Sequence, residues 1–256
     1  NARSRVAAAP SPSESMATHS SYGRSVWACA ERIARSSMPL RQRAGCAGVT
    51  TLIVFLPIPT PGKIMAMSNV GRWAPWYSSL PPNSSPIAYG DSEAYRLGAD
   101  WLKDCAVVQD WGCGLGWARQ FYRADQYVGI DGTESPFADV VADLASPLDL
   151  GVAGWGREGI FMRGVIEHDY NWEKILAHAY RTFTERMCLV LFTPMVLRGP
   201  EQIAFVQKIG VPDLSFSLRN IIEPMREHES IDWKIVEISS PNTGYGVETL
   251  FFMEKP

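Results

Sequence analysis

The sequence contains no long hydrophobic run. Its most apolar stretch, residues 49–58, is short and is interrupted by Pro57. A helix that crosses a membrane needs about 20 consecutive apolar residues. The sequence therefore predicts no membrane-spanning helix and no membrane partner.

Cysteine is scarce and scattered. The chain has five cysteines in 256 residues, and no two of them form a C-x-x-C pair. Zinc ribbons and disulfide frameworks need paired or regularly spaced cysteines. We therefore predict neither a disulfide framework nor a metal site, and the reduced thiols indicate a cytoplasmic location.

Basic residues are scarce in most of the chain. Residues 1–64 carry eight basic and two acidic residues, and residues 65–256 carry the remaining 16 basic and 25 acidic ones. The formal net charge of −3 thus combines +6 in the first part with −9 in the second. A general nucleic-acid binder needs clustered Lys and Arg, so the acidic part argues against a nucleic-acid partner.

Residues 1–64 do not have the composition of a folded domain. The first 20 residues are mostly Ala, Ser, Pro and Arg, which is typical of disorder. We expect this segment to be a disordered or non-native extension, with the natural start at Met65 or Met67. A targeting segment and a genuine flexible extension are the alternatives. The folded domain is predicted to cover residues 65–256.

Strand and helix patterns alternate along this second part. The predicted strands are 106–110, 127–131, 139–143, 159–163, 188–192, 233–238 and 247–253. The predicted helices are 92–105, 116–122, 172–187, 201–209 and 218–229. This alternation predicts an α/β fold, with a mostly parallel sheet and helices on both faces. The last two strands are close enough for a hairpin, so one strand must be antiparallel.

A glycine-rich turn follows the first predicted strand. Residues 110–116 read Asp-Trp-Gly-Cys-Gly-Leu-Gly, with glycines at 112, 114 and 116. Without Cβ atoms, such a turn lets a ligand approach the backbone closely. The free N–H groups at the start of a following helix favour an electronegative ligand group. The turn is therefore a candidate binding loop.

Acidic residues end the first three predicted strands, at Asp110, Asp131 and Asp143. Ligands of open α/β sheets bind beyond the carboxyl ends of the strands, so the three carboxylates should line one crevice. Asp131 is placed to accept hydrogen bonds from two ribose hydroxyls. Asp143 can accept from an adenine amino group, while Leu144 meets the adenine ring.

These residues carry a resemblance to a known family. Residues 110–116 resemble motif I of class I S-adenosylmethionine-dependent methyltransferases, and the order of Asp131, Asp143 and residues 165–168 (Val-Ile-Glu-His) is similar to the rest of that pattern. The resemblance covers about residues 88–256. It implies a Rossmann-like, doubly wound seven-stranded sheet of order 3-2-1-4-5-7-6, with an antiparallel seventh strand.

The resemblance also implies the cofactor and its contacts. S-adenosyl-L-methionine would bind with its methionine part beside Gly112, Gly114 and Gly116 and its amino group near Asp110. Asp131 would hold the ribose.

Glu167 and His168 follow the fourth strand, beside the expected point of methyl transfer. They are the candidate catalytic residues, with His168 as a general base, because an imidazole titrates near neutral pH. The alternative is that the pair orients the cofactor loop or caps the next helix.

Aromatic residues cluster in the segment 65–90, which is predicted to be an arm or lid. The lid would cover the cofactor or acceptor. The alternative is packing on the domain surface, which we favour for Trp73 and Trp76 and leave open for Tyr89. Downstream, residues 193–220 are expected to shape the acceptor pocket, although a solvated helix face would explain their charges equally well.

The predicted function is methyl transfer to a small-molecule or metabolite acceptor by an enzyme of class EC 2.1.1. One alternative is a non-catalytic binding or scaffold protein with the same fold. Another is a nicotinamide-dependent oxidoreductase, whose G-x-G-x-x-G fingerprint needs a small residue where this chain has Trp117.

Overall fold

The computed structural model describes residues 70–79, 92–146, 158–228 and 230–256. All of them belong to the second of two compact units into which the chain divides, Thr60–Pro256. The predicted extension 1–64 lies outside the described residues. In the helices described, no apolar segment is long enough to cross a bilayer.

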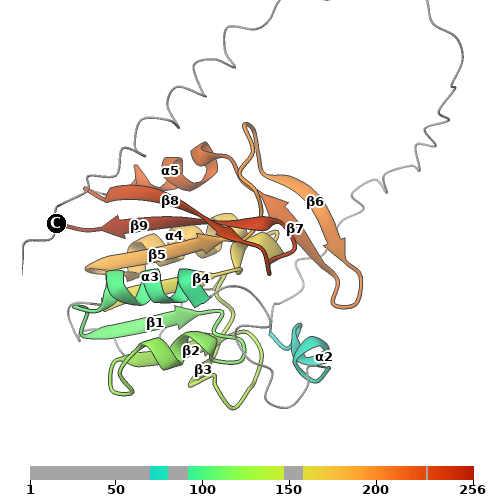
Figure 1. The fold of residues 1–256 in the computed structure, drawn as a ribbon, viewed down its shortest axis with the longest axis horizontal. Coiled ribbons are helices and arrows are strands. Elements are labelled where there is room, and N and C mark those ends of the chain that lie inside the picture. The colour runs from blue at the N-terminus through green and yellow to red at the C-terminus, as the bar shows by residue number, and fades with distance from the viewer. Residues whose placement is uncertain (1–69, 80–91, 147–157, 229) are drawn as a thin grey trace, which may run out of the picture. The chain divides into compact units, whose positions relative to one another are not determined.

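Within the described residues, seven strands form the main sheet in the order β3-β2-β1-β4-β5-β9-β8 (Figure 1). They are β1 (Val107–Trp111), β2 (Tyr127–Asp131), β3 (Val140–Val141), β4 (Glu158–Arg163), β5 (Arg186–Leu191), β8 (Asp232–Ser240) and β9 (Gly246–Glu254). The first five are parallel, and β9 runs antiparallel between β5 and β8. The predicted fold class and strand order are confirmed.

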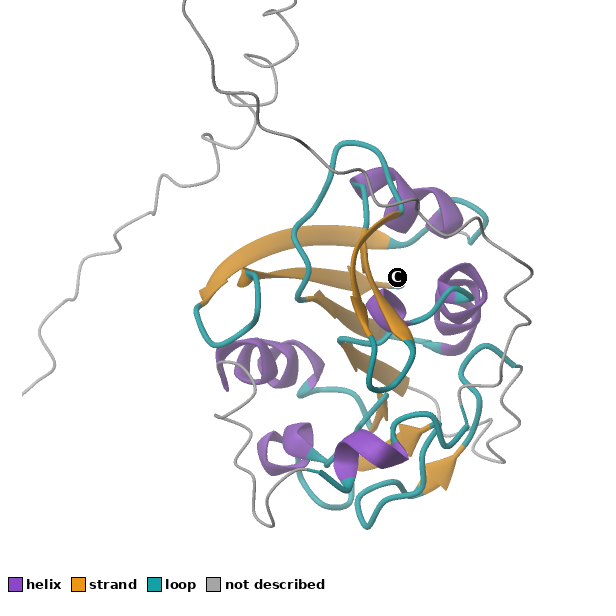
Figure 2. Ribbon diagram, turned by 90° about the vertical axis from the view of Figure 1, so that its right-hand side faces the viewer, coloured by secondary structure: helices purple, strands orange, loops and turns teal. Residues whose placement is uncertain are grey.

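Helices cover both faces of this sheet (Figure 2). One face packs against α3 (Ser92–Leu102), and the other packs against α4 (Trp172–Thr182) and α5 (Leu218–Met225). Neighbouring side chains on a strand point to opposite faces. Accordingly, Phe161 belongs to the cluster under α3, while Ile160 and Met162 belong to the cluster under α4 and α5.

The helix α3 comes close to the sheet at Gly98. A Cβ atom built at Gly98 would lie 2.7 Å from Cδ2 of Phe161 and 3.4 Å from Sγ of Cys188. Phe161 and Cys188 are paired in register and both are fully buried. The absence of a Cβ atom at Gly98 therefore allows this helix to lie close to the sheet.

We expect Gly98→Ala to destabilise the protein by about 1–3 kcal/mol, because the added methyl overpacks a closed interior. Denaturant-induced unfolding followed by circular dichroism measures the change. Ala99→Gly, in the next position of the same helix, is the matched control for helix propensity. A neutral or stabilising Gly98→Ala would show that helix and sheet can separate at little cost.

The prediction of a helix over 201–209 is wrong. This segment forms β6 (Glu201–Val206), which pairs antiparallel with β7 (Val211–Ser215). Ile203, Phe205 and Val206 favour a strand because β-branched and aromatic side chains fit a pleated surface. The turn between the strands ends at Gly210, whose φ is 68°. The hairpin and the short helix α2 (Ala74–Tyr77) lie at the end of the sheet where β1 ends (Figure 1).

Several further elements are shorter than predicted. The helices predicted over 92–105, 172–187 and 218–229 end at Leu102, Thr182 and Met225. Only Val140–Val141 of the third strand pairs with β2. After the glycine-rich turn the chain forms a 3-10 helix, η3 (Trp117–Phe121), and not an α-helix.

Candidate active site

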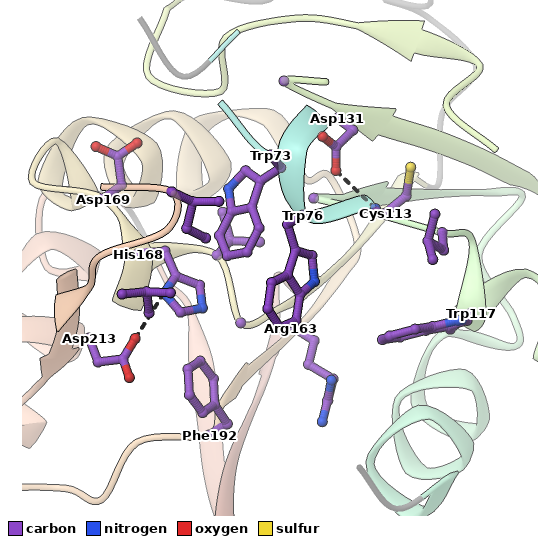
Figure 3. A pocket seen from close by; sticks show the side chains of 18 of the residues that line it. Trp73, Trp76, Cys113, Trp117, Asp131, Arg163, His168, Asp169, Phe192 and Asp213 are labelled. Atoms are coloured by element: carbon purple, nitrogen blue, oxygen red, sulfur yellow. Dashed lines mark hydrogen bonds and ion pairs between the residues drawn. The ribbon is translucent and has the colours of Figure 1, made fainter. Parts of the chain in front are cut away.

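A cavity of about 570 Å³ opens at the carboxyl ends of the parallel strands. Its walls come from the segment around α2, the loops after β1, β2 and β4, the β6–β7 hairpin and the β8–β9 loop. Figure 3 shows Asp131 and Cys113 on one side of this cavity and His168 and Asp213 on the other. The cavity thus has one side formed by the glycine-rich loop and another formed by residues from the second half of the chain.

The glycine-rich loop needs glycine for two reasons. Gly112 and Gly114 line the cavity with φ angles of 76° and 54°, a region that other residues rarely adopt. A Cβ at Gly112 would overlap Cγ2 of Val165, and one at Gly114 would lie 3.3 Å from the hydroxyl of Tyr77. Gly116 also has a positive φ but faces Phe137, away from the lining. The loop therefore exposes bare backbone to the cavity at two of the three predicted glycines.

Asp131 lies at the centre of the hydrogen bonds around this loop. Its Oδ2 accepts from the Gly114 N–H at 2.9 Å and from the Tyr77 hydroxyl at 3.2 Å, and its Oδ1 accepts from the Thr133 N–H at 2.7 Å. Burial raises the pKa of Asp131, and these backbone hydrogen bonds oppose the rise. Asp131 lines the cavity, so its carboxylate can serve a ligand there.

Asp110 is not among the lining residues. Its carboxylate is buried and accepts a 2.5 Å hydrogen bond from the Tyr127 hydroxyl. Burial raises its pKa to about 7, although the bond from Tyr127 favours the ionised form. The structure thus places Asp110 beneath the loop, in contact with β2 and not with the cavity.

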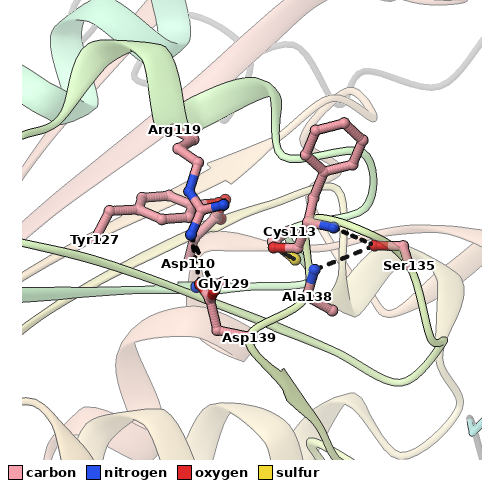
Figure 4. A network of polar contacts seen from close by, with 9 residues as sticks. Asp110, Cys113, Arg119, Tyr127, Gly129, Ser135, Ala138 and Asp139 are labelled. Carbon is pink, nitrogen blue, oxygen red and sulfur yellow. Dashed lines mark hydrogen bonds and ion pairs between the residues drawn. The ribbon is translucent and has the colours of Figure 1, made fainter. Parts of the chain in front are cut away.

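A polar network supports the loop from behind (Figure 4). The Arg119 guanidinium donates to both oxygens of Asp139 at 2.9 Å, and Asp139 also accepts from the Gly129 N–H at 2.8 Å. Arg119 lies over the Tyr127 ring, whose hydroxyl holds Asp110. This chain of contacts ties η3 and β2 to the residue that begins the glycine-rich turn.

The predicted adenine contacts are only partly in the cavity. Leu144 lines it, whereas Asp143 does not, and Oδ1 of Asp143 accepts from the Ala145 N–H at 3.0 Å. His178 is buried, with its Nδ1 3.2 Å from the Leu144 carbonyl. This contact ties α4 to the backbone beside this wall.

His168 lines the cavity on the side away from the glycine-rich loop. Its Nδ1 lies 3.0 Å from the Pro212 carbonyl and 3.1 Å from Oδ1 of Asp213. Its ring contacts those of Trp73 and Phe192, at centroid distances of 4.9 and 5.2 Å. The imidazole is held in place on several sides.

Glu167, the other candidate catalytic residue, does not line the cavity. It is fully buried, and its Oε1 accepts from the Phe192 N–H at 2.9 Å. Burial raises its pKa to about 7. In this position Glu167 ties the turn after β4 to the end of β5.

The segment around α2 contributes more to the cavity than expected. Trp73 and Trp76 both line it, so the preferred assignment of these two to the domain surface is wrong. The segment is fixed by hydrogen bonds from the Gly71 N–H to the Gly132 carbonyl and from the Trp73 N–H to the Thr133 hydroxyl. Tyr89 lies outside the described residues.

Sequence analysis missed several polar residues of the lining, among them Arg163, Asp169, Asp213 and Tyr245. Arg163 ends β4, a position equivalent to those of the strand-end carboxylates, which is the one signal that could have identified it. Asp213 falls in the segment 193–220, which was predicted to shape the acceptor pocket. The basic residues of that segment, Arg198, Lys208 and Arg219, are not among the lining residues.

No protein-family model matches the chain, and no curated protein matches it significantly in sequence. Solved structures with a similar fold include the 1,6-didemethyltoxoflavin-N1-methyltransferase of Burkholderia thailandensis with bound 1,6-didemethyltoxoflavin and S-adenosylhomocysteine. It is 18% identical over 67% of this chain and 79% of that one, with a TM-score of 0.48.

Two others are the magnesium protoporphyrin IX methyltransferase of Synechocystis PCC 6803 with bound S-adenosylhomocysteine and the [4+2]-cyclase SpnF. The first is 15% identical over 72% of this chain and 93% of that one, with a TM-score of 0.44. The second is 11% identical over 64% and 80%, with a TM-score of 0.46. At these identities the likeness concerns the fold alone.

Proposed function

We propose that the protein transfers a methyl group from S-adenosyl-L-methionine to a small-molecule acceptor. One observation carries this proposal: the bare glycine-rich loop and Asp131 share a single cavity with His168. A loop that fits a nucleoside cofactor and a side chain that can take a proton therefore face the same space.

The residues present fit this cofactor. A carboxylate offers about four acceptor positions, and three of those on Asp131 are occupied by Gly114, Thr133 and Tyr77. Two ribose hydroxyls would donate to Asp131. One would take the fourth acceptor position, and the other would replace the Tyr77 hydroxyl at its position. The Gly112 and Gly114 backbone would border the methionine part, and Leu144 the adenine.

The bound cofactor supplies an electrophilic methyl group on a sulfonium sulfur. The chain's own residues align the acceptor, exclude water and accept a proton. Alignment of the two reactants accounts for much of the rate in a reaction of this kind. Trp73 and Trp76 place aromatic faces in the cavity, and such faces attract cations. His168 is the candidate base.

The cavity has the dimensions and lining of a small-molecule site. Its 570 Å³ falls within the roughly 300–1,000 Å³ typical of small-molecule sites. Val206 and Ile209 of the hairpin and Tyr245 of the β8–β9 loop line it together with His168. The acidic body of the chain argues against nucleic acid.

Calorimetry on the full-length protein tests the cofactor. We expect S-adenosylmethionine and S-adenosylhomocysteine to bind with one-to-one stoichiometry and NADH not to bind. Asp100→Ala, an exposed carboxylate on α3, is the control variant that should bind equally well. If NADH binds and S-adenosylhomocysteine does not, the methyltransferase assignment is lost. Binding without turnover on a broad acceptor panel would favour a non-catalytic protein.

A further inference from the structure

The Nδ1 atom of His168 faces two groups that can only accept hydrogen bonds. They are the Pro212 carbonyl at 3.0 Å and Oδ1 of Asp213 at 3.1 Å. Neither a carbonyl nor an ionised carboxylate can donate. Nδ1 must therefore carry the ring proton, which leaves the lone pair of the neutral imidazole on Nε2.

Asp213 is held as a carboxylate. Burial disfavours its charge, but the nearby His168 ring and the hydrogen bond from Tyr245 hold its pKa below the usual value. The Tyr245 hydroxyl donates to Oδ2 at 2.7 Å, whereas Oδ1 lies within ion-pair distance of His168 Nδ1 and receives no hydrogen bond of good geometry. The side chain is largely buried, and the hydrogen bond from Tyr245 fixes the rotation of the carboxylate.

The three residues of this arrangement come from separate parts of the chain. His168 ends the 3-10 turn η4 (Ile166–His168), Asp213 is in β7, and Tyr245 is in the loop between β8 and β9. All three line the cavity. The β6–β7 hairpin thus brings a carboxylate to the histidine, and Trp73 and Phe192 limit the tilt of its ring.

We propose that Asp213 is a positioning residue that sets the tautomer of His168, so that Nε2 accepts a proton from the methyl acceptor. This inference rests on the proposed function and deepens it. The acceptor is then a molecule whose nucleophile is a weakly acidic O–H or N–H group. Its heteroatom bonds to the methyl carbon, the carbon–sulfur bond breaks with its electron pair remaining on sulfur, and the acceptor's proton passes to Nε2.

Nitrogen NMR of the full-length protein with ¹⁵N-labelled histidine tests this directly. In the wild type at a pH where the ring is neutral, we expect His168 to carry its proton on Nδ1. In Asp213→Asn the amide can turn its NH₂ group towards Nδ1, so the population should shift towards the Nε2–H tautomer. Asp100→Asn, a matched substitution on the exposed face of α3, should leave the tautomer unchanged.

Two results would overturn the inference. One is an Nε2–H tautomer in the wild type. The other is an unchanged tautomer in Asp213→Asn, which would mean that the Pro212 carbonyl is sufficient. If Asp213→Asn does not fold, Tyr245→Phe replaces it: loosening the carboxylate should move the Nδ1 proton resonance upfield, and an unmoved resonance would count against Asp213.

Titration with S-adenosylhomocysteine separates this inference from the proposed function. If the wild type does not bind it, the proposed function fails whatever the tautomer. If the wild type binds it but Asp213→Asn keeps the tautomer, only the role of Asp213 fails. For any acceptor that turns over, Asp213→Asn should lower kcat by about 100-fold, the smaller end of what a positioned base contributes. KM for S-adenosylmethionine should not change.

Discussion

Replacement of Glu248 by alanine is expected to lower the free energy of unfolding by about 3–5 kcal/mol, because it leaves the guanidinium of Arg163 buried without its carboxylate. Glu248 is fully buried, and the Arg163 side chain is 9% exposed. Oε1 of Glu248 accepts from Nε at 2.7 Å and lies 2.5 Å from Nη2. Among the ion pairs of the described residues, this one has the lowest side-chain exposure.

The surroundings of Arg163 supply only part of what the carboxylate provides. The Tyr95 hydroxyl accepts from Nη1 at 3.0 Å, and the guanidinium lies over the Tyr95 ring at 4.9 Å from its centroid. These contacts do not neutralise the charge. Without Glu248 the cation must either stay buried unpaired or move into the cavity that it lines, and both alternatives cost free energy.

Urea-induced unfolding of the full-length protein measures the loss. Glu254→Ala is the matched control. Glu254 lies on the same strand as Glu248, β9, and pairs with Arg186 at 3.0 Å, but its side chain is 42% exposed. Exposed pairs contribute about 0–1 kcal/mol. Equal effects of Glu248→Ala and Glu254→Ala would contradict the expectation. The double variant Arg163→Met with Glu248→Leu should recover much of the loss, because it removes both charges together.

The strands could be predicted because their signals are local, whereas their order was implied by the resemblance to a known family. Each parallel strand is a short apolar run, and the glycine-rich turn follows one of them directly. The carboxylate of Asp131 ends a strand that lies beside β1, and two neighbouring parallel strands must present their ends on the same side. Local pattern and sheet geometry together were enough to bring Gly114 and Asp131 into one site.

The partners of His168 and Arg163 could not be predicted in the same way. Asp213 and Glu248 are 45 and 85 residues away from them along the chain, and no spacing rule relates such pairs. The error over 201–209 hid one of them, because a helix there would not have placed Asp213 on a strand beside the η4 turn. The pairing of charged residues so far apart in the sequence can be inferred only when the topology of the hairpin and of β9 is known.

The position of Trp73 shows a different limit. Aromatic residues next to prolines can pack on a surface or close a cavity, and composition does not distinguish the two. What decides is a pair of hydrogen bonds donated by backbone N–H groups, from Gly71 to the Gly132 carbonyl and from Trp73 to the Thr133 hydroxyl. Because the donors are backbone N–H groups, the side chains of the donor residues do not predict these bonds.

Asp131→Ala is expected to reduce the affinity for S-adenosylhomocysteine by at least about 100-fold. Hydrogen bonds to charged groups contribute roughly 1.5–3 kcal/mol each, and two ribose hydroxyls would lose theirs. Every 1.4 kcal/mol is about tenfold in affinity. The same substitution removes the acceptor of the Gly114 and Thr133 N–H groups, so the loop loses its shape as well as its ligand.

Calorimetry with Asp131→Ala and Asp131→Asn separates these two effects. The asparagine keeps one carbonyl oxygen, which can serve either the loop or the ribose but without the charge. We therefore expect an intermediate affinity for Asp131→Asn and a melting temperature closer to that of the wild type than for Asp131→Ala. Wild-type affinity in Asp131→Ala would remove the ribose assignment and leave Asp131 as a loop support alone. If the Asp131 carboxylate binds both the loop and the ligand, its replacement should lower both the stability and the affinity. Only the loss in affinity should depend on removal of the negative charge.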